Sequence, residues 1–239
     1  AQYCLFEQKT LTGNGNYSVG IWQGNELKRV FYMLDTNGCG GASDASMANG
    51  HTTKTVGLAQ DQIKWYTEEI TALKGVAPNV KISFAYHIQA AIFGKAYEKY
   101  GFNQAVVEQN INLDLRSDTT EGDFGHIGRQ MKNPWDEDFS IFNGMKALGT
   151  DSIFVGHEHC NSASVVYEGV RFQFGQKSSE YDRFNYIHAD GSIASVNAGN
   201  GKSLMGGTVI PLAVDGSLKT PYIYYCGYAG GEIDWSQWK

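Results

Sequence analysis

Two histidines, one residue apart, end an apolar run in the segment SIFVGHEHCNS, residues 152–162. Imidazole nitrogens are the commonest ligands for zinc- and iron-type metals in proteins. Histidines as close as His157 and His159 can share one ion, or serve two ions about 3.5 to 4 Å apart. The segment therefore indicates a metal site, with hydrogen-bonded loop histidines as the plainer alternative.

A third histidine stands at the same place in the pattern. His87 closes the strand-like segment VKISFAY, as His157 closes SIFVG. If these strands are parallel neighbours joined by a helical crossover, their carboxyl ends share one edge of the sheet, where ligands usually bind. Gly156 is expected to let the backbone turn off its strand without steric cost. The pattern predicts that His87, His157 and His159 face one region.

The elements that must position these histidines follow from hydrophobic periodicity. Helical spacing predicts a helix over 58–73, and two further helices are expected over 90–100 and about 136–148. Runs of β-forming residues predict strands over 17–22, 28–35, 80–86 and 152–156. Residues 101–135 are polar and without clear periodicity, as functional loops often are.

The second half of the chain reads as β-structure. Turn signals stand between alternating apolar runs, which is typical of hairpins, at Glu168-Gly169, Asp190-Gly191 and Asp215-Gly216. Helices that alternate with strands early and a late β-meander predict an α/β fold. We expect residues 1–239 to form a single domain.

Composition limits the classes of partner. Of the 239 residues, 42% are hydrophobic and 18% charged, as in ordinary soluble proteins, and no run reaches the roughly 18 to 20 apolar residues of a membrane helix. A net charge of −6 argues against nucleic acid or an anionic membrane as a partner, but not against a small phosphorylated substrate. The cysteines form no CxxC pair, so their disulfide state and the compartment, secreted or cytoplasmic, stay open: Cys4, Cys39, Cys160 and Cys226.

The motif GHEH resembles the last motif, G-H-x-H, of the calcineurin-like metallophosphoesterases, the superfamily that includes purple acid phosphatases. Three other segments are similar to parts of that family and occur in its order, between Tyr17 and Asn185. LDTNGCG resembles a strand end, GLAQDQIKWYTEEI a helix in which glutamine precedes tryptophan, and FAYHIQA the strand that ends in a lone metal-binding histidine. The proline that often follows this histidine in the family is absent here.

The resemblance implies a metallophosphoesterase-like β-sandwich flanked by helices and a binuclear centre of divalent or Fe/Zn/Mn-type ions. His87 and His157 would bind the second metal, and His159 the first. Glu158 would lie behind the ligands or at the surface. The expected activity is hydrolysis of a phosphoester, with the substrate and the metal identity left open.

Three earlier motifs of that family are missing from this sequence. They are an Asp-x-His, a Gly-Asp whose aspartate bridges the metals, and an Asn-His. The chain is therefore expected to correspond to the C-terminal portion of such an enzyme, completed by an N-terminal segment, and to be inactive alone. The alternative is a non-catalytic, degenerate phosphoesterase-like module that binds a ligand or a protein partner.

The loop TEGDFGHIGRQ contains candidates for substrate binding. This glycine-punctuated loop holds His126 and Arg129, and an arginine there would suit a phosphate group. A solvated loop with local Asp-Gly turns is the alternative.

Overall fold

The chain forms two compact units, which we describe separately. A computed structural model describes residues 10–38, 56–105, 109–110, 126–178, 184–187, 193–196 and 206–225. The first unit comprises Ala1–Ile92, Asn133–Val155 and Val214–Ser217, and the second comprises Phe93–Lys132, Gly156–Ala213 and Leu218–Lys239, within those described ranges. The secondary structure is α/β with a mixed sheet, as the sequence predicts.

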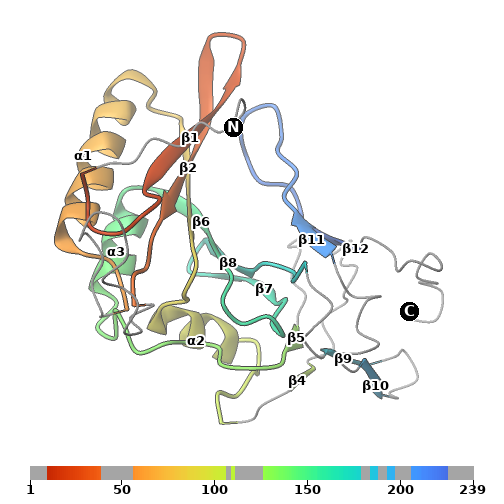
Figure 1. Ribbon diagram of the computed structural model, residues 1–239. Coiled ribbons are helices and arrows are strands. Elements are labelled where there is room, and N and C mark those ends of the chain that lie inside the picture. Colours follow the sequence, from red (N-terminus) through yellow and green to blue (C-terminus); the bar gives the residue numbers. More distant parts are fainter. Residues whose placement is uncertain are drawn as a thin grey trace. The chain divides into compact units, whose positions relative to one another are not determined.

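A mixed sheet forms the centre of the first unit (Figure 1). Its strands stand in the order β1 (Tyr17–Gln23), β2 (Glu26–Leu34), β3 (Lys81–Tyr86) and β6 (Thr150–Val155). β1 and β2 form an antiparallel pair, whereas β2, β3 and β6 run parallel. The condition set for a shared strand edge is therefore met, because β3 and β6, the strands that precede His87 and His157, are parallel neighbours.

The three predicted helices are present with shifted ends: α1 (Gln60–Val76), α2 (Ala91–Glu98) and α3 (Ser140–Ala147). α3 begins later than predicted because the carboxylate of Asp136 accepts the amide hydrogens of Ile141 at 2.8 Å and Phe142 at 2.9 Å. Phe139 has φ 59°, outside the helical region, and so marks the start. Within the described ranges, no helix has the length and apolar character needed to cross a membrane.

One face of the sheet packs against α1 through aromatic side chains. Tyr66 of α1 meets Phe84 of β3 edge-on, with ring centroids 4.9 Å apart, and Phe84 also contacts Tyr32 at 5.5 Å. Tyr66 and Ile70, four residues apart on α1, are 1% and 0% exposed and form its inner face. Burying each such side chain contributes about 1.5 to 3 kcal/mol, so this layer is the core of the unit.

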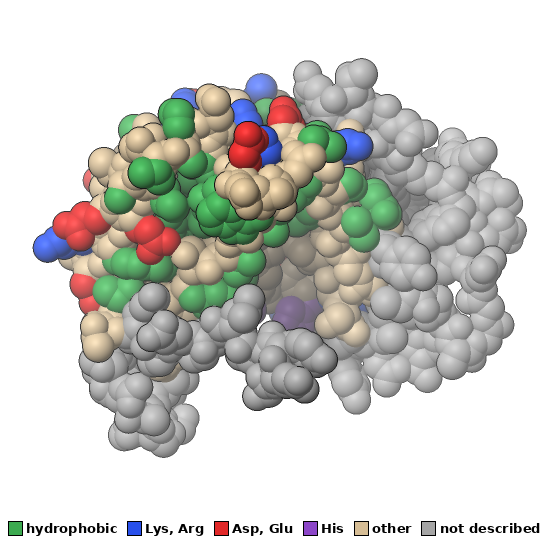
Figure 2. All heavy atoms as spheres, turned by 90° about the horizontal axis from the view of Figure 1, so that it is seen from above, with side chains coloured by type: hydrophobic (Ala, Val, Ile, Leu, Met, Phe, Trp, Pro, Cys, Tyr) green, Lys and Arg blue, Asp and Glu red, His purple; other side chains and the backbone are tan. Residues whose placement is uncertain are grey.

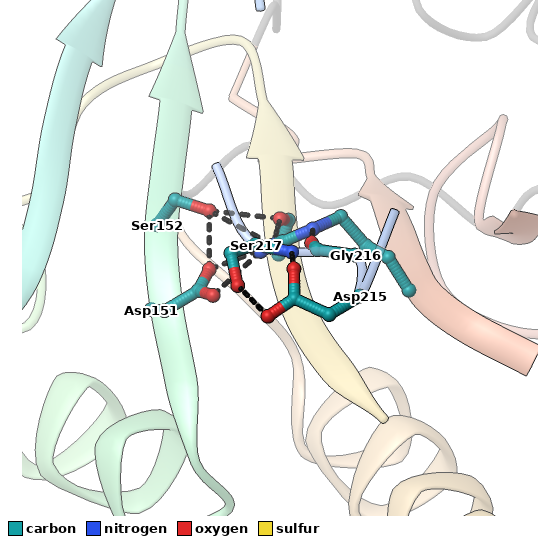
Figure 3. A network of polar contacts seen from close by, with 7 residues as sticks. Asp151, Ser152, Asp215, Gly216 and Ser217 are labelled. Carbon is teal, nitrogen blue, oxygen red and sulfur yellow. Dashed lines mark hydrogen bonds and ion pairs between the residues drawn. The ribbon is translucent and has the colours of Figure 1, made fainter. Parts of the chain in front are cut away.

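The sheet also buries a charged network (Figure 3). The register between β3 and β6 shifts at Ile82/Ser83, so that Asp151 is an extra residue in β6, as in a β-bulge. The side chain of Arg29 is 0% exposed and donates to both carboxylate oxygens of Asp151, at 2.7 and 2.6 Å. Its Nε donates to the carbonyl oxygen of Gly216 at 2.7 Å. This bidentate pair ties β2, β6 and the 214–217 segment together.

The second unit contains short antiparallel pairs. β7 (Ser164–Tyr167) and β8 (Val170–Phe174) form the predicted hairpin around Glu168 and Gly169, whose φ angles of 49° and 80° are those of a type I′ turn. The other pairs are β9 (Phe184–Ile187) with β10 (Ile193–Val196), β11 (Gly206–Val209) with β12 (Tyr222–Tyr225), and β4 (Gln109–Asn110) with β5 (His126–Ile127).

These pairs differ in two ways from the sequence-based expectation. β9–β10 and β11–β12 are separate two-stranded ladders in the described part of the chain, not successive strands of one meander. β4 and β5 fall in the polar stretch for which no structure was expected. Asp215-Gly216 lies in the loop between β11 and β12, as predicted, while Asp190-Gly191 lies outside the described residues.

Hydrophobic side chains gather on the face seen in Figure 2. In the first unit, Trp22 is 61% and Val76 83% exposed. Both line a groove of about 810 Å³ between the β1–β2 hairpin and the end of α1, where Leu27 and Leu73 also contribute.

Candidate functional site

The turn that carries His87 begins where β3 ends. Tyr86, the last residue of β3, pairs with Val155, the last residue of β6, so both strands end at the same level of one sheet edge. His87 is exposed, and the amide of the next residue, Ile88, donates to the hydroxyl of Thr36 at 3.0 Å. Thr36 follows β2, so the third parallel strand helps to fix the backbone beside His87.

The turn that carries His157 is strained. Glu158 N–H donates to the carbonyl of Gly156 at 2.8 Å, which closes a three-residue turn with His157 at its centre. His157 has φ 65°, and γ-turns with positive φ are rare and strained. We expected Gly156 to take up the turn; instead the left-handed residue is His157, where a side chain costs roughly 1 to 2 kcal/mol. Strain of this kind is concentrated at functional sites.

The carboxylate of Glu158 lies beside this imidazole. Glu158 is 9% exposed, so the surface position considered from the sequence is wrong. One of its carboxylate oxygens lies 3.9 Å from Nε2 of His157, within ion-pair range but beyond a hydrogen bond. His157 and His159 themselves are exposed.

Asn161 anchors the loop that contains Arg129 to the histidine turn. Its side-chain oxygen accepts the amide hydrogens of Gly128 and Arg129, both at 2.9 Å, and its Nδ2 donates to the carbonyl of Gln130 at 2.9 Å. Gly128 N–H also donates to the carbonyl of Cys160 at 3.1 Å. Asn161 is fully buried and was not identified from the sequence, although it stands two residues after His159.

The two candidate substrate-binding residues, Arg129 and His126, lie in different parts of the loop. Arg129 is exposed, and its backbone is held next to the turn with His157 and His159 through Asn161. His126 forms part of β5, where it pairs with Asn110. Their role in binding substrate stays a prediction.

The metal ligands predicted from the sequence belong to both units. His87 lies in the first unit, and His157 and His159 lie in the second. Among the described residues, no group of three or more His, Cys, Asp or Glu side chains is arranged to hold a metal ion. The donor type therefore fits a zinc- or iron-type metal, but the number of donors gathered does not.

One of the four cysteines, Cys160, lies within the described residues. Cys160 is buried and free of any disulfide. Cys4, Cys39 and Cys226 lie outside the described residues.

The segments LDTN and QDQIKW are joined by a buried amide network. Nε2 of Gln62 donates to Oδ1 of Asn16 at 2.7 Å and to the carbonyl of Asp35 at 2.8 Å. Oε1 of Gln62 accepts the amide of Ala59 at 2.8 Å, at the start of α1, and Nδ2 of Asn37 at 3.2 Å. Gln62 is 0% exposed, so its role is to connect the end of β2 to α1.

Comparison with known proteins assigns no family to the chain. No protein-family model matches it, and no curated protein matches it significantly. The function is therefore inferred from the residues described above.

Proposed function

We propose that this chain contributes histidine ligands to the binuclear metal centre of a phosphoester hydrolase of the metallophosphoesterase type. The fold proposed with it is a metallophosphoesterase-like β-sandwich flanked by helices, of which this chain is the C-terminal part. The ligands are His87, His157 and His159. The other ligands, including a bridging carboxylate, come from an N-terminal segment that this sequence does not contain.

One observation carries the proposal: β3 and β6 are parallel neighbours that end at paired residues, Tyr86 and Val155, and each is followed by an exposed histidine. Ligands of α/β proteins bind at such an edge. The strained turn at His157 and the buried carboxylate of Glu158 beside it add support, because neither feature is needed to end a strand.

Each residue then has a defined task. The imidazoles of His87, His157 and His159 would hold the metal ions, with the carboxylate of Glu158 beside the imidazole of His157. Metal bound there would supply Lewis-acid chemistry, namely activation of a water and stabilisation of charge on the phosphoryl oxygens. Arg129, whose backbone amide donates to Asn161, would contact a phosphate oxygen of the substrate.

Metal titration of the purified 239-residue chain tests the ligand assignment. Isothermal titration with Zn²⁺ and absorption spectra with Co²⁺ are expected to show weak binding that His157→Ala and His159→Ala abolish. His51→Ala removes a histidine outside both motifs and is the matched control. His87→Ala is the third motif substitution. Metal binding that survives in each of the three variants would contradict the assignment.

The hydrolase part of the proposal has a separate test. The chain alone is expected not to hydrolyse p-nitrophenyl phosphate or bis-p-nitrophenyl phosphate, with or without added metal. Intact mass and N-terminal sequencing of the protein from its natural source, with elemental analysis, should find a further N-terminal segment and about two metal ions. Full activity of the 239-residue chain alone would refute completion by another segment.

A second candidate is a non-catalytic module that binds a ligand or a protein partner. The absence of a gathered ligand set among the described residues favours it. If mass and elemental analysis find that the natural protein contains only these residues and no metal, this alternative is supported over the hydrolase.

A further inference from the structure

A polar pocket lies within the second unit, and the residues that line it do not belong to the histidine motifs. It measures about 550 Å³ and lies between the end of α2, the β7–β8 turn and the segment before β12. Its lining includes Lys99, Tyr100, Glu168, Arg171 and Lys219. This volume falls in the range of small-molecule sites, about 300 to 1,000 Å³.

The charge of this lining is opposite to that of the whole chain. Among the described residues of the lining, Lys99, Arg171 and Lys219 carry three positive charges and Glu168 carries one negative charge. The chain as a whole carries −6. A concave, locally cationic site on an acidic protein attracts small anions selectively, because its field is focused in the pocket.

Neighbouring contacts hold two of these cations in place. Nζ of Lys99 lies 5.4 Å from the ring centroid of Tyr100, and the hydroxyl of Tyr100 donates to the carbonyl of Val166 at 2.7 Å, which fixes the ring. Arg171 is only 9% exposed, and its Nη1 donates to the hydroxyl of Ser164 at 2.9 Å. Side chains that are already ordered lose less conformational entropy when a ligand binds.

We propose that this pocket binds a small soluble anion that carries at least two negative charges, of the phosphate-ester or pyrophosphate class. Arg171 supplies the planar donor group that suits phosphate oxygens, and the two lysines supply compact charges. The hydroxyl group of Thr220, also in the lining, is a further donor for an oxyanion. The site is distinct from the histidine motifs and does not depend on a metal.

Isothermal titration of the metal-free 239-residue chain with sodium pyrophosphate at low salt tests this proposal. Lys99→Gln and Lys219→Gln are expected to weaken binding about threefold to tenfold each, as the loss of one exposed positive charge near a multiply charged anion should. Both side chains are exposed, so these substitutions leave the fold intact. Addition of salt should weaken binding of the unsubstituted chain.

The matched control is Lys95→Gln. Lys95 is an exposed lysine one turn earlier on α2, paired with Glu98 at 3.4 Å and outside the pocket lining. It should leave the affinity for pyrophosphate unchanged. The proposal is overturned if pyrophosphate does not bind, or if Lys95→Gln weakens binding as much as the pocket substitutions do.

Two further outcomes separate this pocket from other sites. If His157→Ala abolishes pyrophosphate binding while Lys99→Gln does not, the anion binds at the histidine turn and the proposal fails. Binding to vesicles that contain phosphoinositides, without binding to pyrophosphate, would show a lipid surface as the ligand and equally overturn it. Failure of the metal proposal would leave these results unchanged.

Discussion

Replacement of His157 by glycine measures the strain in the turn after β6. His157 has φ 65° in a three-residue turn closed by the 2.8 Å bond from Glu158 N–H to Gly156 C=O. A residue with a Cβ loses roughly 1 to 2 kcal/mol in this left-handed conformation. Glycine avoids that loss. However, the greater conformational freedom of its unfolded chain lowers the free energy of unfolding by about 0.5 to 1 kcal/mol.

The informative comparison is His157→Gly with His157→Ala, because both remove the imidazole and its contact with Glu158. Only the glycine variant relieves the backbone. We expect the free energy of unfolding of His157→Gly to exceed that of His157→Ala by about 1 kcal/mol, measured by urea denaturation followed by circular dichroism. Glu168, with φ 49° in the β7–β8 turn, offers a positive control through Glu168→Gly and Glu168→Ala.

Equal stability of His157→Gly and His157→Ala would refute the strain, provided that the pair at Glu168 shows the expected difference. A larger free energy of unfolding for His157→Gly than for the unsubstituted chain would mean that the imidazole is retained at the expense of stability. That is the pattern expected of a functional residue.

Other substitutions test the buried contacts and the acid range. Asp151→Ala should lower the free energy of unfolding by about 3 kcal/mol and more than Arg29→Met does, because it leaves the buried guanidinium without its carboxylate, as urea denaturation will show. Asn161→Ala should cost about 1 to 3 kcal/mol and speed the hydrogen exchange of the amides it binds. Burial raises the pKa of Asp61, but the amide and hydroxyl of Thr12 outweigh it and hold that pKa below its ordinary value. The stabilisation from Asp61 is therefore complete above about pH 4 and lost as the pH falls through the lowered pKa, so Asp61→Asn should make stability less dependent on pH in that range.

Local patterns were enough to predict the elements of the first unit. The inner face of α1 could be read from the spacing of Tyr66 and Ile70, and the strands from short runs of β-forming residues. The two-residue turn at Glu168 and Gly169 was also predictable, because its conformation depends on its own residues. These features require no knowledge of distant contacts.

Features that depend on distant residues were not predictable. Arg29 can be buried only because Asp151, 122 positions later, meets it. Gln62 is a polar residue that periodicity alone does not place in a core, and it is buried because Asn16 and the carbonyl of Asp35 satisfy its amide. The role of Asn161 in the candidate site was not predictable either, because it depends on hydrogen bonds to the distant Gly128–Gln130 backbone.

β1 is an edge strand without charged side chains. The strand carries no charged residue between Tyr17 and Gln23, and it is the outermost strand of the first unit's sheet among the described residues. Proteins commonly place lysine or proline on an edge strand, which prevents it from pairing with strands of other chains. Here the pairing of β1 with β2 contains a β-bulge instead, because Lys28 is an extra residue of β2 at the register shift between Ile21 and Trp22. Resistance to intermolecular strand pairing therefore rests on backbone geometry, and an insertion or deletion near Trp22 would affect aggregation more than folding.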